Sequence, residues 1–449
     1  MMKTDAVFHI EVARKINSSE KRSNLETLVR TALEEEKEEF ISCFNYDDFL
    51  ARHPSLKSHI QSIRVYVEHQ SNSNIRLTAQ PSSSPQKRKT PDIFAKISKD
   101  LKLRINLYVH DLCKDGEEAE YMNDEENDQS ASSHHWILPS ASFDGLWDTL
   151  IFDDNVQSRL MKYINSTLLF SEKGVDTNLI SWNKVILLHG PAGTGKTSLC
   201  KALAQKASIR LGSRYMYGQL IEINSHSLFS KWFSESGKLV MKMFEKIHDL
   251  VEDPKCIVFL LIDEVESLAQ CRQSAEAGNE PTDSIRAVNA LLTQIDRIKK
   301  FPNVVILTTS NMVGCIDLAF VDRADLKIYI GAPPVDIIYR ILASSVNELI
   351  RVGIIDSKSK ISDDVAVSNR NGGEKLLDSS AAKLLAISKL ASGMSGRTLR
   401  KIPFLAHSNF MASTVVTDLE SFLDGLERAV ETEMKEVEAL RNNSKPILI

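Results

Sequence analysis

The segment "GPAGTGKT" at residues 190–197 combines three glycines with a lysine and a threonine, residue types that can hold a polyphosphate. A glycine-rich backbone can turn its N–H groups toward phosphate oxygens at the positive end of a helix. In this pattern Lys196 reaches the β and γ phosphates, and the Thr197 hydroxyl ligates Mg²⁺. The segment follows a predicted strand and opens a predicted helix, which is the context that the chemistry requires. We therefore predict an ATP site formed by Gly190, Pro191, Ala192, Gly193, Thr194, Gly195, Lys196, Thr197 and Ser198.

An acidic pair supplies the second half of this chemistry. The apolar run "CIVFLLI" ends in Asp263 and Glu264, so both carboxylates should emerge at the carboxyl end of a buried strand, where open α/β sheets bind ligands. We expect Asp263 to hold Mg²⁺ through water and Glu264 to polarise the attacking water. An apolar strand ending in two acids is often only structural, but its place after a phosphate-binding loop favours the catalytic interpretation.

Three more polar residues could reach a γ-phosphate. Asn311 follows the strand "VVILTTS" and should arrive at the same sheet edge as Asp263. Arg323 lies among aspartates in "DLAFVDRAD", where a simple surface ion pair is the alternative. Arg397 stands in the first turn of a predicted helix that begins in "SGMSGRTLRK".

The stretch "SKWFSESGKL" at residues 230–239 places two adjacent aromatic residues among polar ones. Large aromatic side chains grip an unfolded polypeptide through apolar contact without reading its sequence. Neither a strand nor a core helix easily explains this stretch. The two aromatic rings could fold back onto the domain core.

Composition narrows the possible partners. The 449 residues are 43% hydrophobic and 26% charged, and the formal net charge of −5 provides no general basic field for nucleic acid or an anionic membrane. The first residues lack the apolar run of a signal peptide, so we expect a soluble, intracellular protein. The six cysteines form no CxxC pair, which indicates reduced thiols rather than zinc ligands or a disulfide framework.

The elements that must position these residues suggest an α/β fold in four parts. Residues 1–112 contain two alternating strand patterns, a helical pattern and a basic loop, and are predicted to be an α+β domain that binds a substrate or adaptor. Residues 113–135 are predicted to be an acidic linker. Residues 136–332 alternate apolar strands with helices, which indicates a parallel sheet covered on both faces. Residues 333–449 are predicted to be a small helical domain.

Taken together and in this order, these motifs resemble those of the AAA+ ATPases. The segments "FDGLWDTLIFDD", "SLFSKWFSESGKLV", "DEVESL", "AVNALLTQID" and "SGMSGRTLRKIPFLAH" are similar to the pachytene checkpoint protein 2 family. The resemblance implies an N-terminal substrate-recognition domain before an AAA+ module, a homo-hexameric ring, and ATP-driven remodelling of HORMA-domain proteins with a HORMA-type adaptor. It also implies action in meiotic chromosome-axis control and spindle checkpoint silencing, in the nucleus and cytoplasm.

The same resemblance assigns roles to single residues. It makes Asn311 the sensor-1 residue, Arg397 the sensor-2 residue and Arg323 the finger that reaches a neighbouring subunit's nucleotide. It also places Lys231, Trp232 and Phe233 in a pore loop that contacts a polypeptide substrate, and the alternative is that the two aromatic rings fold back onto the domain core. Two positions depart from the common pattern: Ala192 stands where a proline is usual, and "VDRAD" keeps one arginine where two are usual.

Two other functions fit a phosphate-binding loop. One is a nucleotide-gated scaffold without mechanical activity, and the other is an AAA+ motor that acts on DNA or another substrate. Glu264 disfavours the scaffold, since a protein that only binds nucleotide has no need to position a water. The acidic balance and the aromatic loop disfavour the DNA motor.

Overall fold

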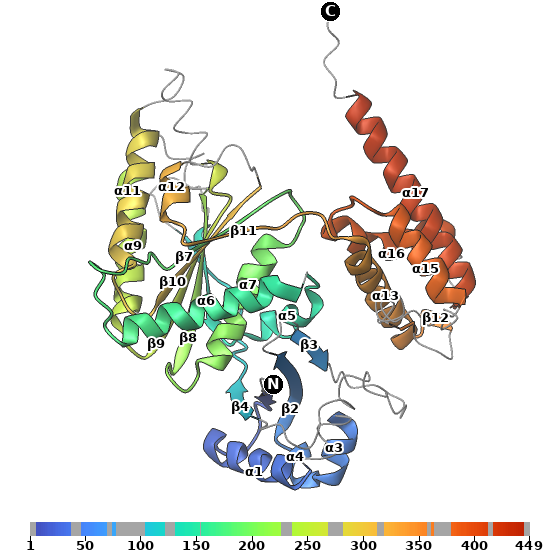
Figure 1. The fold of residues 1–449 in the computed structure, drawn as a ribbon, viewed down its shortest axis with the longest axis horizontal. Coiled ribbons are helices and arrows are strands. Elements are labelled where there is room, and N and C mark those ends of the chain that lie inside the picture. The colour runs from blue at the N-terminus through green and yellow to red at the C-terminus, as the bar shows by residue number, and fades with distance from the viewer. Residues whose placement is uncertain are drawn as a thin grey trace, which may run out of the picture. The chain divides into compact units, whose positions relative to one another are not determined.

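The computed structural model describes twelve stretches of the chain. These are residues 6–36, 46–69, 74–77, 104–121, 131–152, 154–225, 236–267, 282–311, 318–356, 361–362, 379–411 and 416–443. The chain divides into two compact units (Figure 1). The first unit comprises Met1–Leu150, Asp154–His189 and Lys196–Tyr329, and the second comprises Ile151–Asp153, Gly190–Gly195 and Ile330–Ile449.

The N-terminal part of the first unit is a four-stranded sheet with helices on one face, as the sequence predicts. The strand order is β3-β2-β1-β4, in which β1 runs antiparallel to β2 and parallel to β4. Phe8, Ile10 and Val12 alternate along β1 and pack with helix residues such as Leu25 and Val29 in one apolar core. The elements are β1 (Ala6–Arg14), α1 (Arg22–Glu35), α3 (Tyr46–Arg52), α4 (Pro54–Lys57), β2 (Ile60–His69), β3 (Asn74–Leu77) and β4 (Arg104–Asp111).

The opposite face of this sheet is polar and, in part, also buried. His9, Glu11 and His110 are each less than 10% exposed, although alternating strands usually place such residues in water. The alternating pattern of these strands is typical of a sheet with one buried face. The structure covers the second face with residues of the larger sheet domain, as the ion pair between Glu11 and Lys206 shows.

The larger sheet of the first unit has seven strands in the order β11-β7-β10-β9-β8-β6-β5. The five strands from β11 to β8 are parallel, and β6 and β5 continue the sheet antiparallel. The apolar strands predicted from the sequence are present, among them β9 at "CIVFLLI" and β10 at "VVILTTS". The strands are β5 (Glu118–Tyr121), β6 (Ala131–Leu138), β7 (Val185–His189), β8 (Tyr217–Asn224), β9 (Cys256–Asp263), β10 (Val304–Ser310) and β11 (Leu326–Tyr329).

Apolar side chains bury both faces of this sheet. Val240, Phe244 and Ile247 of α9 and Leu291 of α11 pack against alternate residues of β7 to β10. Helix α7 contacts β6, β8, β9 and β10. The helices of this unit outside the N-terminal module are η1 (Ala141–Phe143), α5 (Leu146–Thr149), α6 (Asp154–Glu172), α7 (Lys196–Arg210), α9 (Ser236–Glu252), α11 (Thr282–Ile298) and α12 (Leu318–Arg323).

Strand β5 and the first half of β6 fall on the segment that the sequence predicted as an acidic linker. β5 pairs with β6, and Ser133 of β6 pairs with Ile223 of β8, so this segment extends the sheet. Acidic residues tolerate such an edge because one side of an edge strand stays in water. The bounds of the four predicted parts stay a prediction, since the structure divides the chain by compactness and not by role.

The second unit is helical, as predicted from residue 333 onward. Its core joins Ile338 and Leu342 with Leu384, Leu399 and Phe422, all buried. A short parallel bridge between β12 and β13 ties the ends of two loops together. The elements are α13 (Val335–Arg351), β12 (Ile355–Asp356), α15 (Ser379–Leu390), α16 (Gly396–Phe410), β13 (Thr417–Asp418) and α17 (Leu419–Asn443). Across both units, the part of the chain that the structure describes holds no helix long and apolar enough to cross a membrane.

Candidate nucleotide-hydrolysis site

The glycine-rich loop between β7 and α7 has a backbone that only glycine allows at two points. Gly190 and Gly193 have φ values of 146° and 77°. A β-carbon on Gly190 would lie 2.1 Å from the carbonyl oxygen of Ile330, and one on Gly193 would lie 2.9 Å from Ser395 Oγ. Thr194 Oγ1 donates to the carbonyl oxygen of Pro191 at 3.0 Å and closes the loop. The loop therefore has the compact turn that phosphate binding requires.

Arg397 is attached to this loop through its backbone. Its N–H donates to the carbonyl oxygen of Gly193 at 3.0 Å. Ser395 caps α16, because its hydroxyl accepts from Thr398 N. The Arg397 side chain is exposed, which leaves the guanidinium available for a phosphate. Within the second unit, the structure thus brings together two segments that the sequence predicted separately.

In the first unit, the residues after the loop meet the acidic strand. Lys196 is buried, and Thr197 Oγ1 donates to Asp263 Oδ1 at 2.9 Å. Strand β10 lies between β7 and β9, and the Thr309 hydroxyl on it donates to the same carboxylate oxygen. Hydroxyl and carboxylate oxygens are the ligand types that Mg²⁺ prefers, so the Thr197 and Asp263 oxygens fit a magnesium site.

Glu264 adopts a left-handed backbone conformation, with φ of 57°. This conformation costs a non-glycine residue roughly 1–3 kcal/mol and persists only where neighbours hold it. The Glu264 carbonyl oxygen accepts from Ser225 Oγ at 2.7 Å and from Ser267 Oγ at 2.9 Å. The Glu264 N–H donates to Thr309 Oγ1 at 3.3 Å. Three hydroxyls therefore fix the backbone from which this carboxylate projects.

Asn311 reaches the same carboxylate from the end of β10. Its side-chain amide Nδ2 donates to Glu264 Oε1 at 3.4 Å. Its backbone N–H donates to Glu266 Oε1 at 3.1 Å, and Glu266 is buried. The predicted meeting of Asn311 with the acidic pair is thus present in the structure.

Arg323 is held by a carboxylate of its own chain. Its guanidinium binds both oxygens of Asp296, with Nε 3.2 Å from Oδ1 and Nη2 2.8 Å from Oδ2. Burial raises the pKa of Asp296, but hydrogen bonds from Arg323 and Lys299 outweigh burial and leave that pKa below its usual value. The ion pair offered as the alternative for Arg323 is therefore present. A role toward a neighbouring subunit would require this pair to open.

Comparison with known proteins decides the family. The model of the ATPase family associated with various cellular activities (AAA) matches residues 186–332, and that of the TRIP13-like, AAA+ ATPase lid C-terminal domain matches residues 334–434. The Gallus gallus pachytene checkpoint protein 2 homolog is 45% identical over 430 residues, which are 95% of this chain and 93% of that protein. The Homo sapiens homolog is 53% identical over 332 residues, 74% of this chain and 76% of that protein.

The chain belongs to the pachytene checkpoint protein 2 family of AAA+ ATPases. The solved structure of C. elegans PCH-2 has a TM-score of 0.73 and 34% identity, and the match covers 95% of this chain and 99% of that one. The family assignment predicted from the motifs is confirmed, as are the N-terminal domain followed by an AAA+ module and the ATPase activity.

The geometry of this pachytene checkpoint protein 2 family member identifies residues that the sequence motifs did not. Thr309 orders both members of the acidic pair, and Ser225 and Ser267 brace Glu264. Asp325 accepts hydrogen bonds from the backbone of Asn183 and Lys184 and from Tyr163, so it anchors the chain that enters β7. The polar ending of "VVILTTS" was the one signal for Thr309, because a buried strand rarely carries hydroxyls without partners.

The remaining predicted site residues lie on the phosphate-binding loop, at the start of α7, or outside the described part of the chain. Pro191 and Ala192 are exposed on the loop, and Ser198 is half-buried in the first turn of α7. Lys231, Trp232 and Phe233 lie outside the described residues. The polypeptide-contacting loop therefore stays a prediction of the sequence.

Proposed function

We propose that this chain is an ATP-driven remodeller of HORMA-domain proteins. Membership of the pachytene checkpoint protein 2 family supports the substrate class. The observation that carries the proposal is the fixed placement of Glu264, whose backbone is braced by three hydroxyls and whose carboxylate accepts from Asn311. A scaffold that only binds ATP has no need for a strained, braced carboxylate at this position.

In the proposed reaction each residue has a separate task. Lys196 binds the β and γ phosphates, while Glu264 takes a proton from the attacking water and Asn311 orients Glu264 and that water. Thr197 and Asp263 would hold Mg²⁺, directly or through water, and Mg²⁺ would neutralise negative charge on the phosphates. These roles use the contacts that the site already makes and need no rearrangement within the first unit.

The proposal also covers the assembly of subunits into a ring and the force that the ring applies to its substrate. We infer that the chain forms a homo-hexamer in which Arg323 leaves Asp296 and reaches the nucleotide of a neighbouring subunit. Lys231, Trp232 and Phe233 line the central pore and pull on the substrate chain, which partly unfolds it. Arg397, whose backbone is bonded to the phosphate-binding loop, reports nucleotide state to the small helical domain.

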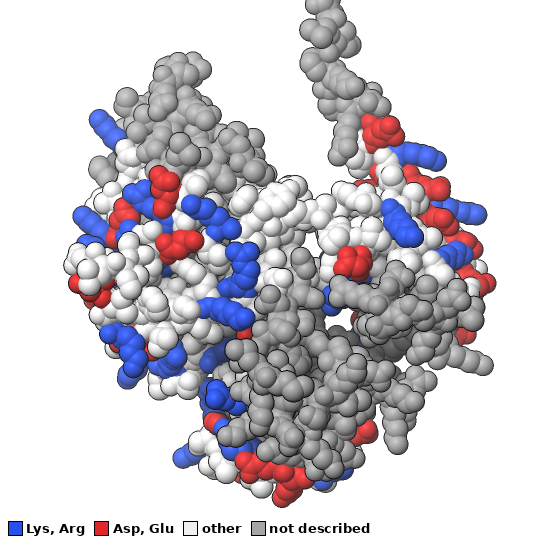
Figure 2. Space-filling model, viewed as in Figure 1, with Lys and Arg blue, Asp and Glu red and all other residues white. Residues whose placement is uncertain are grey.

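The partner is a HORMA-domain protein, delivered with a HORMA-type adaptor to the N-terminal module. We propose no direct contact with nucleic acid or membrane. On the face drawn in Figure 2 both units carry basic and acidic side chains, and basic ones prevail on the first unit. The net charge of the whole chain is −5, and this acidic balance supports a protein partner rather than a phosphate backbone. The proposed places of action are the nucleus, at meiotic chromosome axes, and the cytoplasm during checkpoint silencing.

One experiment tests this function. The purified full-length chain is incubated with ATP, Mg²⁺ and a HORMA-domain protein, with and without an adaptor, and both phosphate release and the conformation of the HORMA-domain protein are followed. We expect faster phosphate release and conversion of the substrate to a second conformer that requires ATP hydrolysis. ATP hydrolysis that no HORMA-domain protein stimulates, with no conversion, would overturn the proposal.

A further inference from the structure

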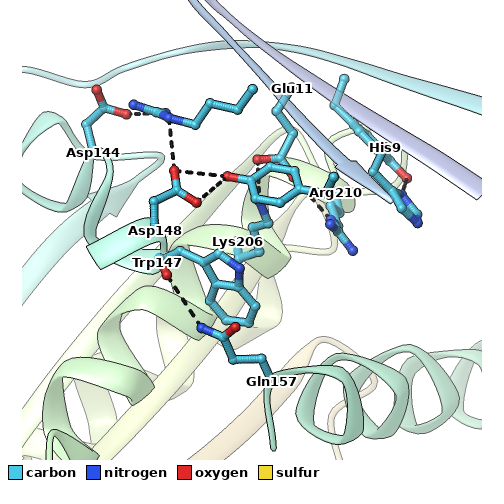
Figure 3. A network of polar contacts seen from close by, with 11 residues as sticks. His9, Glu11, Asp144, Trp147, Asp148, Gln157, Lys206 and Arg210 are labelled. Atoms are coloured by element: carbon cyan, nitrogen blue, oxygen red, sulfur yellow. Dashed lines mark hydrogen bonds and ion pairs between the residues drawn. The ribbon is translucent and has the colours of Figure 1, made fainter. Parts of the chain in front are cut away.

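Glu11 of the N-terminal sheet lies buried against helix α7 of the AAA+ module (Figure 3). Its Oε2 is 2.6 Å from Lys206 Nζ, and its Oε1 is 3.1 Å from Arg210 Nε. Glu11 is 3% exposed and Lys206 is 2% exposed. Burial raises the pKa of Glu11, but Lys206 and Arg210 outweigh burial and lower that pKa, so the carboxylate is ionised at neutral pH.

A second set of contacts surrounds this ion pair. Lys206 Nζ lies 3.1 Å from the centre of the Tyr66 ring, a cation–π contact, and the Tyr66 hydroxyl donates to Asp148 Oδ1 at 2.9 Å. Arg64 binds Asp144 at 2.6 Å and Asp148 at 3.2 Å. Strands β1 and β2 of the module are thus bonded both to α7 and to the segment before α6. A polar network with this many partners fixes one arrangement of the parts that it joins.

The other end of α7 is the nucleotide site. The helix begins at Lys196, the phosphate-binding lysine, and Lys206 is on the same helix at a distance of about 15 Å along its axis, from a rise of 1.5 Å per residue. A single unbroken helix transmits a shift at one end to the other. The bonds of Glu11 therefore tie the orientation of the N-terminal module to the helix that holds the phosphates.

Energetics argue that these contacts serve arrangement more than stability. A buried ion pair gains little over an apolar pair of the same size, because each charge loses its hydration. An apolar contact between the module and α7 would hold the two parts together equally well. Charges in fixed geometry instead favour one orientation over the others.

We propose that Glu11, Lys206 and Arg210 are positioning residues that couple the N-terminal module to the nucleotide site. Nucleotide binding and the docked orientation of the module then shift each other's equilibrium by the same factor. The consequence for substrate rests on the proposed function: a HORMA-domain protein bound to the module would change ATP turnover through α7.

The test compares two double variants, each of which replaces both partners of an ion pair of α7 by neutral side chains. Full-length Glu11→Gln/Lys206→Met removes the buried charges, and Lys201→Met/Glu222→Gln removes the ion pair of 2.7 Å that α7 makes with β8. Hydrogen–deuterium exchange of peptides covering β1 and β4 is measured with and without a non-hydrolysable ATP analogue. We expect the analogue to slow their exchange roughly tenfold in the unchanged chain and in the control pair, a typical coupling strength, and not in Glu11→Gln/Lys206→Met.

Two results would overturn the coupling. One is an unchanged nucleotide effect in a folded Glu11→Gln/Lys206→Met chain, which would make the pair a packing contact only. The other is no nucleotide effect on β1 and β4 in the unchanged chain. Arg210→Gln, which removes the more exposed of the two cations, provides a milder variant if the double variant does not fold.

A second measurement, the rate of ATP hydrolysis, tests whether the coupling also acts when a substrate is bound. Basal ATP hydrolysis should stay within about twofold in Glu11→Gln/Lys206→Met, whereas stimulation by a HORMA-domain protein should fall about tenfold, matching the lost coupling. Absence of stimulation in the unchanged chain would contradict the proposed function. The exchange measurement would still decide the coupling, because it uses nucleotide alone.

Discussion

The side-chain amide of Asn311 donates to Glu264 Oε1 at 3.4 Å, across two neighbouring parallel strands. This hydrogen bond orients the carboxylate of Glu264 through its Oε1 atom. The amide of Asn311 can also accept a hydrogen bond from a bound water or donate one to it. The contact fits the roles that we propose, with Glu264 as the general base and Asn311 as the residue that orients it.

Glu264→Gln should retain ATP affinity and lose hydrolysis, because an amide cannot take a proton from water but fills the same space. Nucleotide binding and phosphate release check the two effects separately. Glu252→Gln, at an exposed position on α9, is the matched control and should turn over normally. Normal turnover in Glu264→Gln would remove this residue from the reaction.

Thr309→Val should lower kcat by about 10- to 100-fold, because we propose that Asp263 holds Mg²⁺ and this is the usual cost of losing the hydrogen-bond partner of a metal ligand. The hydroxyl of Thr309 bonds Asp263 and accepts from Glu264 N, so its loss loosens both acids. The variant should also need more Mg²⁺ for half-maximal rate. Thr308→Val on the same strand removes only a bond to the Ile186 carbonyl and serves as control. Equal kcat values in the two variants would contradict the role of Thr309.

Arg323→Ala should bind ATP and hydrolyse it about a thousandfold more slowly, if this arginine completes a neighbour's site. Mixing it with Glu264→Gln should restore part of the rate, because some interfaces then join an intact arginine to an intact glutamate. Asp296→Asn should keep or raise the basal rate, since it weakens the bond that holds Arg323 in its own subunit. A mixture that never regains activity would show that Arg323 does not act between subunits.

Trp232→Ala should abolish remodelling of a HORMA-domain protein while basal ATP hydrolysis and Tm persist. A pore residue touches substrate and not the phosphates. Were Trp232 a core residue, its truncation would instead lower the free energy of unfolding by about 3–5 kcal/mol and reduce hydrolysis with it. Thermal melting and conformer conversion, measured on the same preparation, separate the two interpretations.

Acid should destabilise the N-terminal module partly through His110. Burial lowers the pKa of His110 from 6.5 to about 4, with Glu11, Arg64, Asp144 and Arg22 as the charged groups around it. Because the unfolded chain takes up this proton at a higher pH than the folded chain, stability should fall between pH 6.5 and 4. The loss from this group should total about 3 kcal/mol and change no further below pH 4.

His110→Leu should flatten that part of the stability profile. Neither ring nitrogen of His110 has a hydrogen-bond partner among the described residues, so the substitution removes no bond there. Urea unfolding from pH 7 to pH 4, followed for both chains, checks the difference. Parallel profiles for the two chains would exclude His110 as a source of the acid sensitivity.

The sequence by itself determined the chemistry of single elements. The segment from Gly190 to Thr197 indicates a phosphate-binding loop because Gly190 and Gly193 allow its positive φ values, and the apolar run before Asp263 indicates a buried strand with acids at its end. These properties depend on neighbours in the chain, so local patterns are enough to reveal them. The helices of the second unit were predictable for the same reason, from the spacing of their apolar residues.

Only the tertiary structure decided which distant residues meet. The order β7-β10-β9 places β10 beside β9, so that Thr309 and Thr197 both bond Asp263 Oδ1, and no pattern within a strand encodes its neighbours in the sheet. The burial of Glu11 against Lys206 could not be predicted from the sequence either, because alternation along β1 shows that one face is polar but not what covers that face. The bond between Arg323 and Asp296 likewise depends on how two helices pack. Sheet order and packing arise from the summed burial of many side chains, and so they become visible only once the chain is folded.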